Sequence, residues 1–380
     1  MKILITTDWY KPVVNGVVTS VINLTRGLEA DGHEVRILTL SDKIFSRKEG
    51  NVYYIGSLGA GAVYPNARIM LLAGHEYVQE LIDWKPDVIH SQCEFSSFVL
   101  ARKISKRTNA PIVHTYHTVY EGYTHYFCPK MSWGKRLVEF FTRKIANRSK
   151  AFIVPSKKIE NMLDTYNISA PMYVVPTGIE LNKYIDEDEE KRNFIRKKYG
   201  IRVDECVLIY AGRLAKEKNI EEILSYMTDE RTENIRLLVA GDGPYRNVVE
   251  EEVKRLELED RVIFAGMIKP EQMADFYKAG DIFVSASTSE TQGLTYMEAM
   301  ASGLSMLCRY DKCLDGVVTN GVTGYTYYDK DEFVEYLLKL KQNKRLRDYV
   351  GFKAKELMIK KFSIHSFVRS CEKVYEQCVA

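Results

Sequence analysis

Long apolar runs are missing from this sequence of 380 residues. No uninterrupted apolar stretch approaches the roughly 20 residues that a membrane-spanning helix needs, so we expect no such helix. The first residues, Met1-Lys-Ile-Leu-Ile, are followed by an acid at Asp8 and by no cleavage site, so no secretory signal peptide is predicted. The seven cysteines are scattered and include no C-x-x-C pair, which argues against a zinc site and for a reducing compartment. We therefore expect a cytoplasmic protein.

A nucleic-acid-binding module is also absent, although the charge is unevenly distributed. Residues 1–176 hold 22 Lys and Arg against 15 Asp and Glu, 22 − 15 = +7, and the other 204 hold 32 against 36, 32 − 36 = −4. A basic first half favours an anionic partner. Because nothing in it resembles a nucleic-acid module, an anionic membrane is the expected partner and nucleic acid is not.

The pattern of elements is that of an α/β protein with two domains. The length exceeds what one compact core usually supports. A strand at Lys2–Thr7, a helical stripe from Val17 to Leu28 and a strand at Val35–Leu40 form a βαβ opening. The second half repeats strand and helix from Cys206 onward, and the charged segment up to Arg192 is interpreted as the crossing between domains. Residues 41–75 are expected to form a long irregular, glycine-rich loop.

The stretch Ser285–Leu304 carries the clearest chemistry. A buried strand precedes it, and a helix is predicted at Leu294–Ala301, ended by Gly303. Gly293 lets a ligand approach the backbone, and the free N–H groups at the start of the helix favour an anion. Glu290 and Glu298, eight residues apart, suit a phosphate flanked by sugars, because carboxylates accept hydrogen bonds from sugar hydroxyls. On the residues alone, a surface loop with one solvated and one ordinary helical glutamate is the simpler interpretation.

Other candidates follow strands in the same way. Gly212-Arg213 and Lys218 come after the strand at 206–211, where they either bind a diphosphate or form ordinary surface charge. His117 ends a strand in H-T-Y-H-T, where a lone histidine is usually structural. Gly16, at the start of the first helix, is either a substrate contact or a turn glycine.

These motifs resemble a known enzyme family. The E-x7-E pattern with its glycine and the following E-A-M-A-S-G resembles the donor-sugar signature of family 4 retaining glycosyltransferases of the GT-B fold. G-R-x-x-x-E-K-N resembles that family's diphosphate clamp, and H-T-Y-H-T its active-site histidine motif. The form S-T-S-E-T-Q-G-L resembles bacterial 1,2-diacylglycerol 3-alpha-glucosyltransferases.

The resemblance covers the whole chain and implies two Rossmann-like parallel-sheet domains with a cleft between them. Residues 1–178 would bind the acceptor, 179–362 would bind the nucleotide sugar, and a C-terminal helix at 363–380 would cross back to the first domain. The reaction implied is transfer of a hexose, expected to be glucose from UDP-glucose, to a membrane lipid, expected to be diacylglycerol, with retention of anomeric configuration.

Site residues carry over by motif. In the catalytic set, His117 would reach the donor sugar, Glu290 would hold its 3- and 4-hydroxyls, and Arg213 and Lys218 would stabilise the leaving diphosphate. The donor-binding set adds residues that contact the nucleotide through backbone, ribose or base: Gly16, Gly293, Leu294, Thr295, Glu298 and Met267.

No metal or other cofactor is expected, since the two cations supply the counter-charge. The D-x-D at Asp186–Asp188, the metal signature of the other major glycosyltransferase fold, lies in a charge run and is interpreted as a solvated face. The alternatives left open are a GDP-mannose-dependent phosphatidylinositol mannosyltransferase, a polysaccharide glycosyltransferase, a GT-B sugar-nucleotide epimerase and a non-catalytic sugar-nucleotide-binding protein.

A basic helix expected at Met131–Arg148 is the candidate membrane contact. Its three- and four-residue spacing places one set of side chains on an apolar side and another towards the opposite side. The apolar set is Trp133, Leu137, Phe140, Phe141 and Ile145, and the basic set is Lys135, Arg136 and Arg143. The alternative is a helix packed on its own sheet with a solvated basic face. Membrane contact would make the protein peripheral at the inner face of the plasma membrane.

Overall fold

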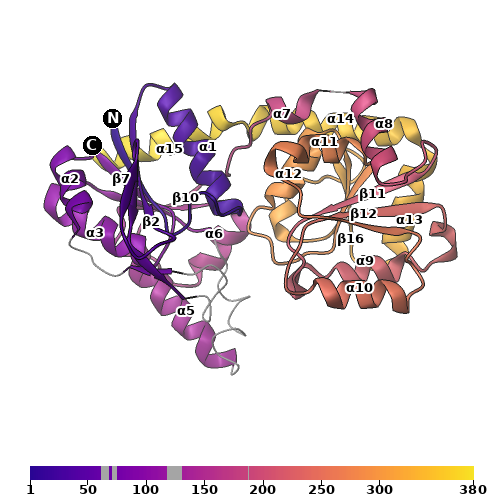
Figure 1. Cartoon of the computed structure of the whole chain (residues 1–380), viewed down its shortest axis with the longest axis horizontal. Helices are drawn as coiled ribbons and strands as arrows, with labels where there is room; N and C mark the ends of the chain where they lie inside the picture. Colours follow the sequence, from indigo (N-terminus) through magenta and orange to yellow (C-terminus); the bar gives the residue numbers. More distant parts are fainter. Residues whose placement is uncertain (61–67, 71–74, 118–130, 187) are drawn as a thin grey trace. The chain divides into compact units, whose positions relative to one another are not determined.

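The computed structural model describes residues 1–60, 68–70, 75–117, 131–186 and 188–380, and the side chains of 131–133 and 135 are outside this description. The chain divides into two compact units (Figure 1). Unit 1 comprises Met1–Gly178 and Ile364–Ala380, and unit 2 comprises Ile179–Ser363. Among the described residues, no helix combines the length and apolarity needed to cross a membrane.

Unit 1 is built on a sheet of order β10-β9-β8-β7-β1-β2-β4-β3, in which all pairs except β3–β4 are parallel. Its strands are β1 Lys2–Thr6, β2 Glu34–Leu40, β3 Arg47–Glu49, β4 Val52–Ile55, β7 Val88–Ser91, β8 Ile112–Thr115, β9 Ala151–Val154 and β10 Met172–Val174. The central strands are buried on both faces, as parallel strands covered by helices are.

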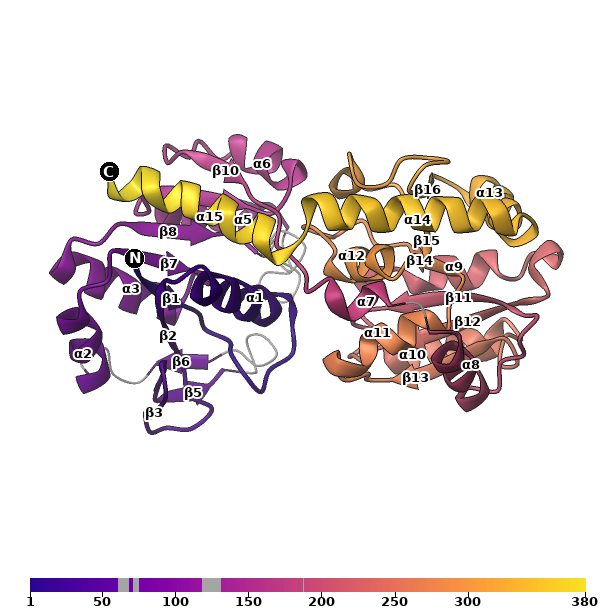
Figure 2. The ribbon, with the colours of Figure 1, turned by 90° about the horizontal axis from the view of Figure 1, so that it is seen from above.

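The helices of unit 1 cover both faces of this sheet. They are α1 Gly16–Ala30, α2 Glu76–Trp84, α3 Ser96–Thr108, α5 Met131–Ala146, α6 Lys157–Asp164 and α15 Ile364–Val379. The C-terminal α15 returns to lie beside α1 (Figure 2), as the resemblance implies. A side chain at Gly27 would overlap Val368, and the Tyr375 hydroxyl lies 2.5 Å from Nδ1 of His90. The last helix is therefore part of the core of unit 1.

The expectation of an irregular segment at residues 41–75 is wrong for the described part. β3 and β4 extend the main sheet there, and β5 (Ser57–Gly59) pairs with β6 (Arg68–Met70) in a separate two-stranded sheet. These strands are only three or four residues long, too short for periodicity to reveal them.

Unit 2 is built on a wholly parallel sheet of order β13-β12-β11-β14-β15-β16. Its strands are β11 Cys206–Ala211, β12 Ile235–Ala240, β13 Val262–Gly266, β14 Ile282–Ser285, β15 Ser305–Arg309 and β16 Gly324–Tyr327. Its helices are α7 Asn182–Ile185, α8 Glu189–Lys198, α9 Ile220–Tyr226, α10 Arg246–Arg255, α11 Met273–Lys278, α12 Leu294–Ala301, α13 Lys330–Gln342 and α14 Lys344–Lys361. Two parallel-sheet Rossmann-like domains confirm the predicted fold class.

The charge run at 186–192 is not the crossing between domains: the units divide at Gly178–Ile179, and the described part of the run belongs to unit 2. Asp188 caps α8 by accepting a hydrogen bond from the Lys191 amide. Arg192, on α8, lies 2.7 Å from Asp281, the residue that precedes β14.

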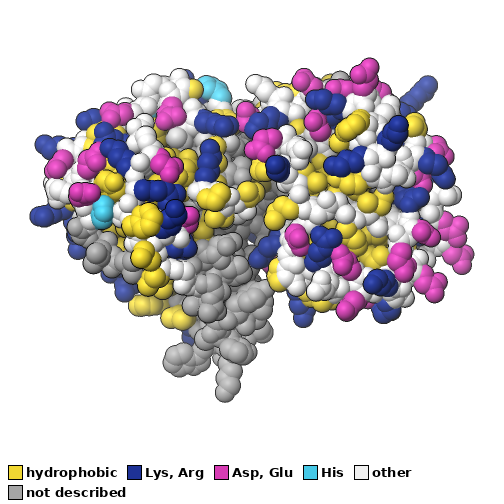
Figure 3. Space-filling model, in the orientation of Figure 1, with side chains coloured by type: hydrophobic (Ala, Val, Ile, Leu, Met, Phe, Trp, Pro, Cys, Tyr) yellow, Lys and Arg dark blue, Asp and Glu magenta, His cyan; other side chains and the backbone are white. Residues whose placement is uncertain are grey.

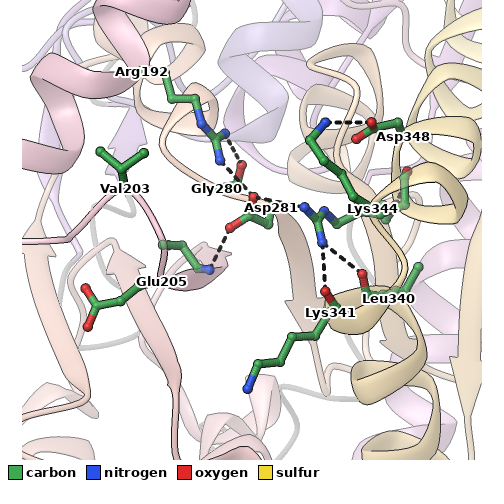
Figure 4. Close-up of polar contacts among 12 residues, drawn as sticks. Arg192, Val203, Glu205, Gly280, Asp281, Leu340, Lys341, Lys344 and Asp348 are labelled. Carbon is green, nitrogen blue, oxygen red and sulfur yellow. Dashed lines mark hydrogen bonds and ion pairs between the residues drawn. The ribbon is translucent and has the colours of Figure 1, made fainter.

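Asp281 joins several elements at the amino end of the sheet (Figure 4). Its carboxylate accepts hydrogen bonds from Arg196 at 2.8 Å and from the Val207 amide at 2.8 Å, and Arg347 lies 3.8 Å away. Burial alone would raise the pKa of Asp281, but Arg192 and Arg196 outweigh it and hold the pKa below its usual value. A single carboxylate therefore links α8, β11, β14 and α14.

We predict that Asp281→Ala destabilises the protein by about 3–5 kcal/mol, because it leaves buried Arg196 without its counter-charge. The measurement is the shift of the urea unfolding transition. Asp204→Ala is the matched control, since Asp204 is 78% exposed and pairs with exposed Arg202, so its effect should stay below about 1 kcal/mol. Equal shifts in the two variants would contradict the structural role given to Asp281.

Candidate active site

The topology of unit 2 brings two candidate loops together. β11 and β14 are neighbours, with Leu208 opposite Ile282 and Ile209 opposite Phe283, although β12 and β13 lie between them in the chain. From β11 the chain continues to β12 on one side, and from β14 to β15 on the other. Ligands of open parallel sheets bind at such a switch point, beyond the carboxyl ends of the strands.

Ion pairs connect the residues that follow these two strands. Nζ of Lys218 lies 2.5 Å from Oε1 of Glu290, which joins the loop after β11 to the loop after β14. The Ser289 hydroxyl donates to the carbonyl of Glu217 at 3.3 Å. Arg213 pairs with Glu217 four residues later. The structure therefore gathers Arg213, Lys218 and Glu290 at one place, which their sequence separation did not show.

Glycines allow the neighbouring loops to approach each other. Gly212 donates to the Ala240 carbonyl at 3.0 Å, and Gly241 donates to the Gly266 carbonyl at 2.8 Å. A Cβ at Gly241 would lie 1.9 Å from the oxygen of Gly212. The backbone that presents Arg213 is thus held by direct loop-to-loop contact.

The start of α12 faces the same end of the sheet. Gly293 precedes the helix at φ +77°, a conformation that favours glycine, and offers no side chain to cap the helix. The first amides of a helix, here those of Leu294 and Thr295, have no partner within the helix and attract anions. Below them, the Tyr296 hydroxyl lies 2.6 Å from that of Ser285 and fixes the helix to β14.

Glu298, one turn into α12, is held by two tyrosines. Its Oε2 accepts a hydrogen bond from Tyr277 at 3.0 Å, and Tyr184 on α7 also donates to the carboxylate. Burial raises the pKa of Glu298 to about 7, against the opposite effects of the two tyrosines and Lys183. Glu298, a hydrogen-bond acceptor with a pKa of about 7, therefore lies on the helix whose first amides are expected to bind the diphosphate.

Met267, the residue assigned to the nucleobase, follows β13 and is 74% exposed. It comes directly after Gly266, which adopts φ +71°. The structure places it after the strand two positions from β11 in the sheet, and its contact with a base stays a prediction.

In unit 1, His117 follows β8 and contacts the end of β7. Its Nε2 lies 2.6 Å from Oε1 of Gln92, the residue after β7. Burial, with a smaller effect of His114, lowers the pKa of His117 to about 3. The ring is therefore neutral at physiological pH, and with Nε2–H donated to Gln92 its Nδ1 is left as an acceptor. Asp8, after β1, has its pKa raised to about 6 by burial and accepts hydrogen bonds from the amides of Phe95 and Ser97.

Gly16 is the first residue of α1 and is exposed. The side chain of Asn15 caps this helix by accepting from the Val18 amide at 2.9 Å. The cap on α1 does not test the predicted substrate contact at Gly16, which still rests on the family resemblance.

The helix expected to contact membrane is observed as α5, and its three- and four-residue spacing keeps the apolar residues on one side, although their burial differs. Ile145 is 3% exposed and Phe141 stacks on Phe95, whereas Leu137 and Phe140 are 62% and 54% exposed. The exposed members lie earlier in the helix and the buried Ile145 near its end, so the apolar side is covered over only part of its length. Arg136 is exposed and Arg143 half-buried, while Trp133 and Lys135 lie in α5 with side chains outside the described residues.

Sequence reasoning assigned no role to several residues of these sites. Glu217 belongs to the quoted clamp motif, four residues after Arg213, so its helical spacing was a usable signal. Gln92 directly follows β7 and, as a polar residue after the apolar run Val88-Ile89, was detectable from the sequence. Tyr184 and Tyr277 carry no such signal, because they reach Glu298 only in the folded unit, where α7 packs on α11 and α12 and Tyr277 donates to Glu298.

We predict that affinity for UDP-glucose rises between pH 6 and 8, by at most about tenfold per pH unit, if Glu298 binds the ribose. The ionised carboxylate accepts from two hydroxyls, and its pKa of about 7 places the change in this window. Calorimetric titration across that range measures the effect, and the phosphates of UDP-glucose do not titrate there. Glu298→Gln should make the profile flat. A profile with the same slope in this variant would remove Glu298 from the ribose site.

Comparison with known proteins places the chain among glycosyltransferases. The family described as Glycosyltransferase Family 4 matches residues 14–183, and Glycosyl transferases group 1 matches 191–357. An alpha-monoglucosyldiacylglycerol synthase of Streptococcus pneumoniae is 36% identical over 89% of this chain and 78% of the relative. An enzyme of the same name from Acholeplasma laidlawii is 32% identical over 99% of this chain and 96% of the relative.

The fold is also similar to that of a solved glycosyltransferase structure. The structure of a sucrose-phosphate synthase from Thermosynechococcus elongatus superposes with a TM-score of 0.79 at 20% identity, covering 99% of this chain and 98% of that one. Sequence and fold together show that this chain is an enzyme of the GT-B glycosyltransferases, a member of the family 4 group to which the alpha-monoglucosyldiacylglycerol synthases belong.

Proposed function

We propose that this enzyme transfers glucose from UDP-glucose to diacylglycerol, with retention of anomeric configuration and without a metal. The observation that supports the nucleotide-sugar donor is the contact between Lys218 and Glu290, a cation and a carboxylate from the segments that follow β11 and β14. The lipid half rests on the two relatives that are named alpha-monoglucosyldiacylglycerol synthases.

Arg213 and Lys218 would stabilise the charge that gathers on the departing diphosphate. Both follow β11, and both are partly buried, at 33% and 19% exposure, where a charge interaction is stronger than in open water. The first amides of α12 would add donors to the same phosphates. These groups do the electrostatic work that Mg²⁺ performs in metal-dependent transferases.

Glu290 would orient the sugar. Its pairing with Lys218 holds the carboxylate beside the cation that would bind the phosphate. Because the hexose is attached to that diphosphate, the carboxylate would lie within reach of the sugar hydroxyls. His117, with a neutral ring whose Nε2 contacts Gln92, would accept a hydrogen bond from the sugar through Nδ1. Retention is inferred from the family resemblance, with the acceptor attacking on the leaving-group side and no covalent enzyme intermediate.

The acceptor would be met at a membrane surface. Leu137 and Phe140 on α5 are exposed beside Arg136 and Lys144, and Lys144 lies 5.8 Å from the Phe140 ring. Apolar and basic side chains also lie side by side on unit 1 in Figure 3. Each basic residue contributes about 1 kcal/mol near an anionic leaflet, and exposed apolar side chains add to this. An anionic inner leaflet of the plasma membrane suits this surface.

We predict transfer of glucose from UDP-glucose to dioleoylglycerol, undiminished after exhaustive EDTA treatment. The measurement is radiolabelled product in a screen of UDP- and GDP-sugars with diacylglycerol, phosphatidylinositol or soluble sugar acceptors. Arg213→Ala should lower turnover by about 10²-fold or more, because it removes a donor to the leaving group. Arg255→Ala, on the exposed surface of α10, is the control and should leave turnover unchanged.

Other products would contradict parts of the proposal. Free epimerised sugar nucleotide without transfer would make the protein an epimerase, and binding without turnover would make it a non-catalytic binder. Activity lost to EDTA and restored by Mg²⁺ or Mn²⁺ would overturn the metal-independent clamp. Transfer of mannose from GDP-mannose to phosphatidylinositol would replace both proposed substrates.

We also predict that the protein co-sediments with liposomes that contain anionic lipid, and less so as salt rises. An Arg136→Ser/Lys144→Ser double variant should bind such vesicles several-fold more weakly, because it removes two charges beside exposed Leu137 and Phe140. A Lys197→Ser/Lys198→Ser variant removes the same charge from α8 and should bind as the wild type does. Equal binding to neutral vesicles, or equal loss in both variants, would contradict docking through α5.

A further inference from the structure

Both cations of the proposed diphosphate site are neutralised from within the protein. Lys218 pairs with Glu290, and Arg213 pairs with Glu217. The formal charges of these four side chains cancel. A nucleoside diphosphate would therefore bind at a site where both cations already form ion pairs with carboxylates of the protein.

The carboxylates of Glu290 and Glu217 differ in whether a substrate group is assigned to them. Glu290 comes from the loop after β14 and is assigned to the sugar. Glu217 lies in the short 3-10 turn Lys216–Lys218, beside Lys218 in the chain, and no substrate group is assigned to it. Its side chain is 15% exposed, and its Oε2 is buried with no hydrogen-bond partner among the described residues. A buried carboxylate oxygen without a partner is costly, so this carboxylate is poorly stabilised for a purely structural role.

The backbone keeps Glu217 where it is. Its carbonyl accepts a hydrogen bond from the Ser289 hydroxyl, and the Lys218 amide donates to the Ala215 carbonyl at 2.9 Å. Tyr210 donates to the carbonyl of Arg213 at 3.3 Å, which holds the other partner. An anion that approaches Arg213 therefore comes close to the carboxylate that pairs with this guanidinium.

We propose that Glu217 is an internal counter-ion that competes with the diphosphate for Arg213. This inference rests on the proposed function, because it takes Arg213 to be a diphosphate ligand. When the site is empty, Glu217 holds the guanidinium. When a nucleoside diphosphate binds, the phosphate replaces that carboxylate as the partner of Arg213, and the displaced negative charge remains nearby.

The consequence is a weaker hold on both donor and product than the two cations alone would give. Product release limits turnover in many enzymes, and a diphosphate held by two unopposed cations would leave slowly. Glu217 thus favours release of the nucleoside diphosphate at the expense of donor affinity.

The test is Glu217→Gln, which keeps the shape and an amide oxygen for Arg213 but removes the charge. Calorimetry with UDP and with GDP, on the full chain, gives the dissociation constant for the better ligand. We expect about tenfold tighter binding, equivalent to about 1.4 kcal/mol. We also expect a lower KM for the sugar nucleotide together with a lower kcat. Mere damage to the fold would not produce tighter binding.

The controls separate a local effect from a global one. Glu252→Gln makes the same charge change on α10, where Glu252 pairs with exposed Arg255, and should leave the nucleotide affinity within twofold of wild type. Glu217→Ala, which also removes the hydrogen-bond acceptor, should bind nucleotide more tightly than wild type as well. Thermal unfolding of each variant establishes that it is folded.

Three results would overturn the inference. Unchanged affinity in Glu217→Gln would show that Glu217 does not compete with the ligand. Weaker binding in both Glu217 variants would show that the carboxylate instead orients Arg213 for the phosphate. In both cases the wild type binds nucleotide and the proposed function stands. Absence of UDP and GDP binding in the wild type would remove the proposed function, and the inference with it.

Discussion

The pairing of β11 with β14 is the constraint on which the candidate donor site depends. Because the two strands are neighbours and parallel, the segments that leave their carboxyl ends must run side by side. That places Lys218 against Glu290, a contact between residues 72 positions apart in the chain. The same geometry directs the start of α12 to this end of the sheet, while Asp281 secures the opposite end of β14 to α8 and α14. The candidate donor-binding residues thus follow the carboxyl end of β14, and the stabilising carboxylate of Asp281 precedes its amino end.

Unit 1 also carries polar candidate residues after the carboxyl ends of neighbouring parallel strands. Its chain reverses direction across the sheet between β1 and β7, and Asp8, Gln92 and His117 follow β1, β7 and β8. The contact of His117 with Gln92 fixes the ring, as the contact of Glu298 with Tyr277 fixes a carboxylate in unit 2. In both units the residue taken from the family motif is positioned by a neighbour that the motif does not include.

Much of the fold could be predicted from sequence, because long buried strands and amphipathic helices leave clear patterns. The helix at 294–301 was predicted with the bounds it has, since a strand, a glycine and Gly303 delimit it. The short strands at 47–59 left no pattern, and the length of α5 over which its apolar side is covered depends on the elements it meets. In the site, motif residues such as Arg213 were predictable. Tyr184, Tyr277 and the competing charge of Glu217 depend on three-dimensional packing, and the roles of the motif residues themselves remain predictions.

The central claim is that the diphosphate of the donor binds where the segments after β11 and β14 meet. Amide hydrogen exchange in the presence and absence of UDP tests it most directly, because exchange slows where a ligand fixes the backbone. The account predicts slower exchange in residues 212–219 and 290–297, with little change around Asp281 at the other end of the sheet. Slower exchange confined to the region of Asp281, or no change in either loop at saturating UDP, would contradict it.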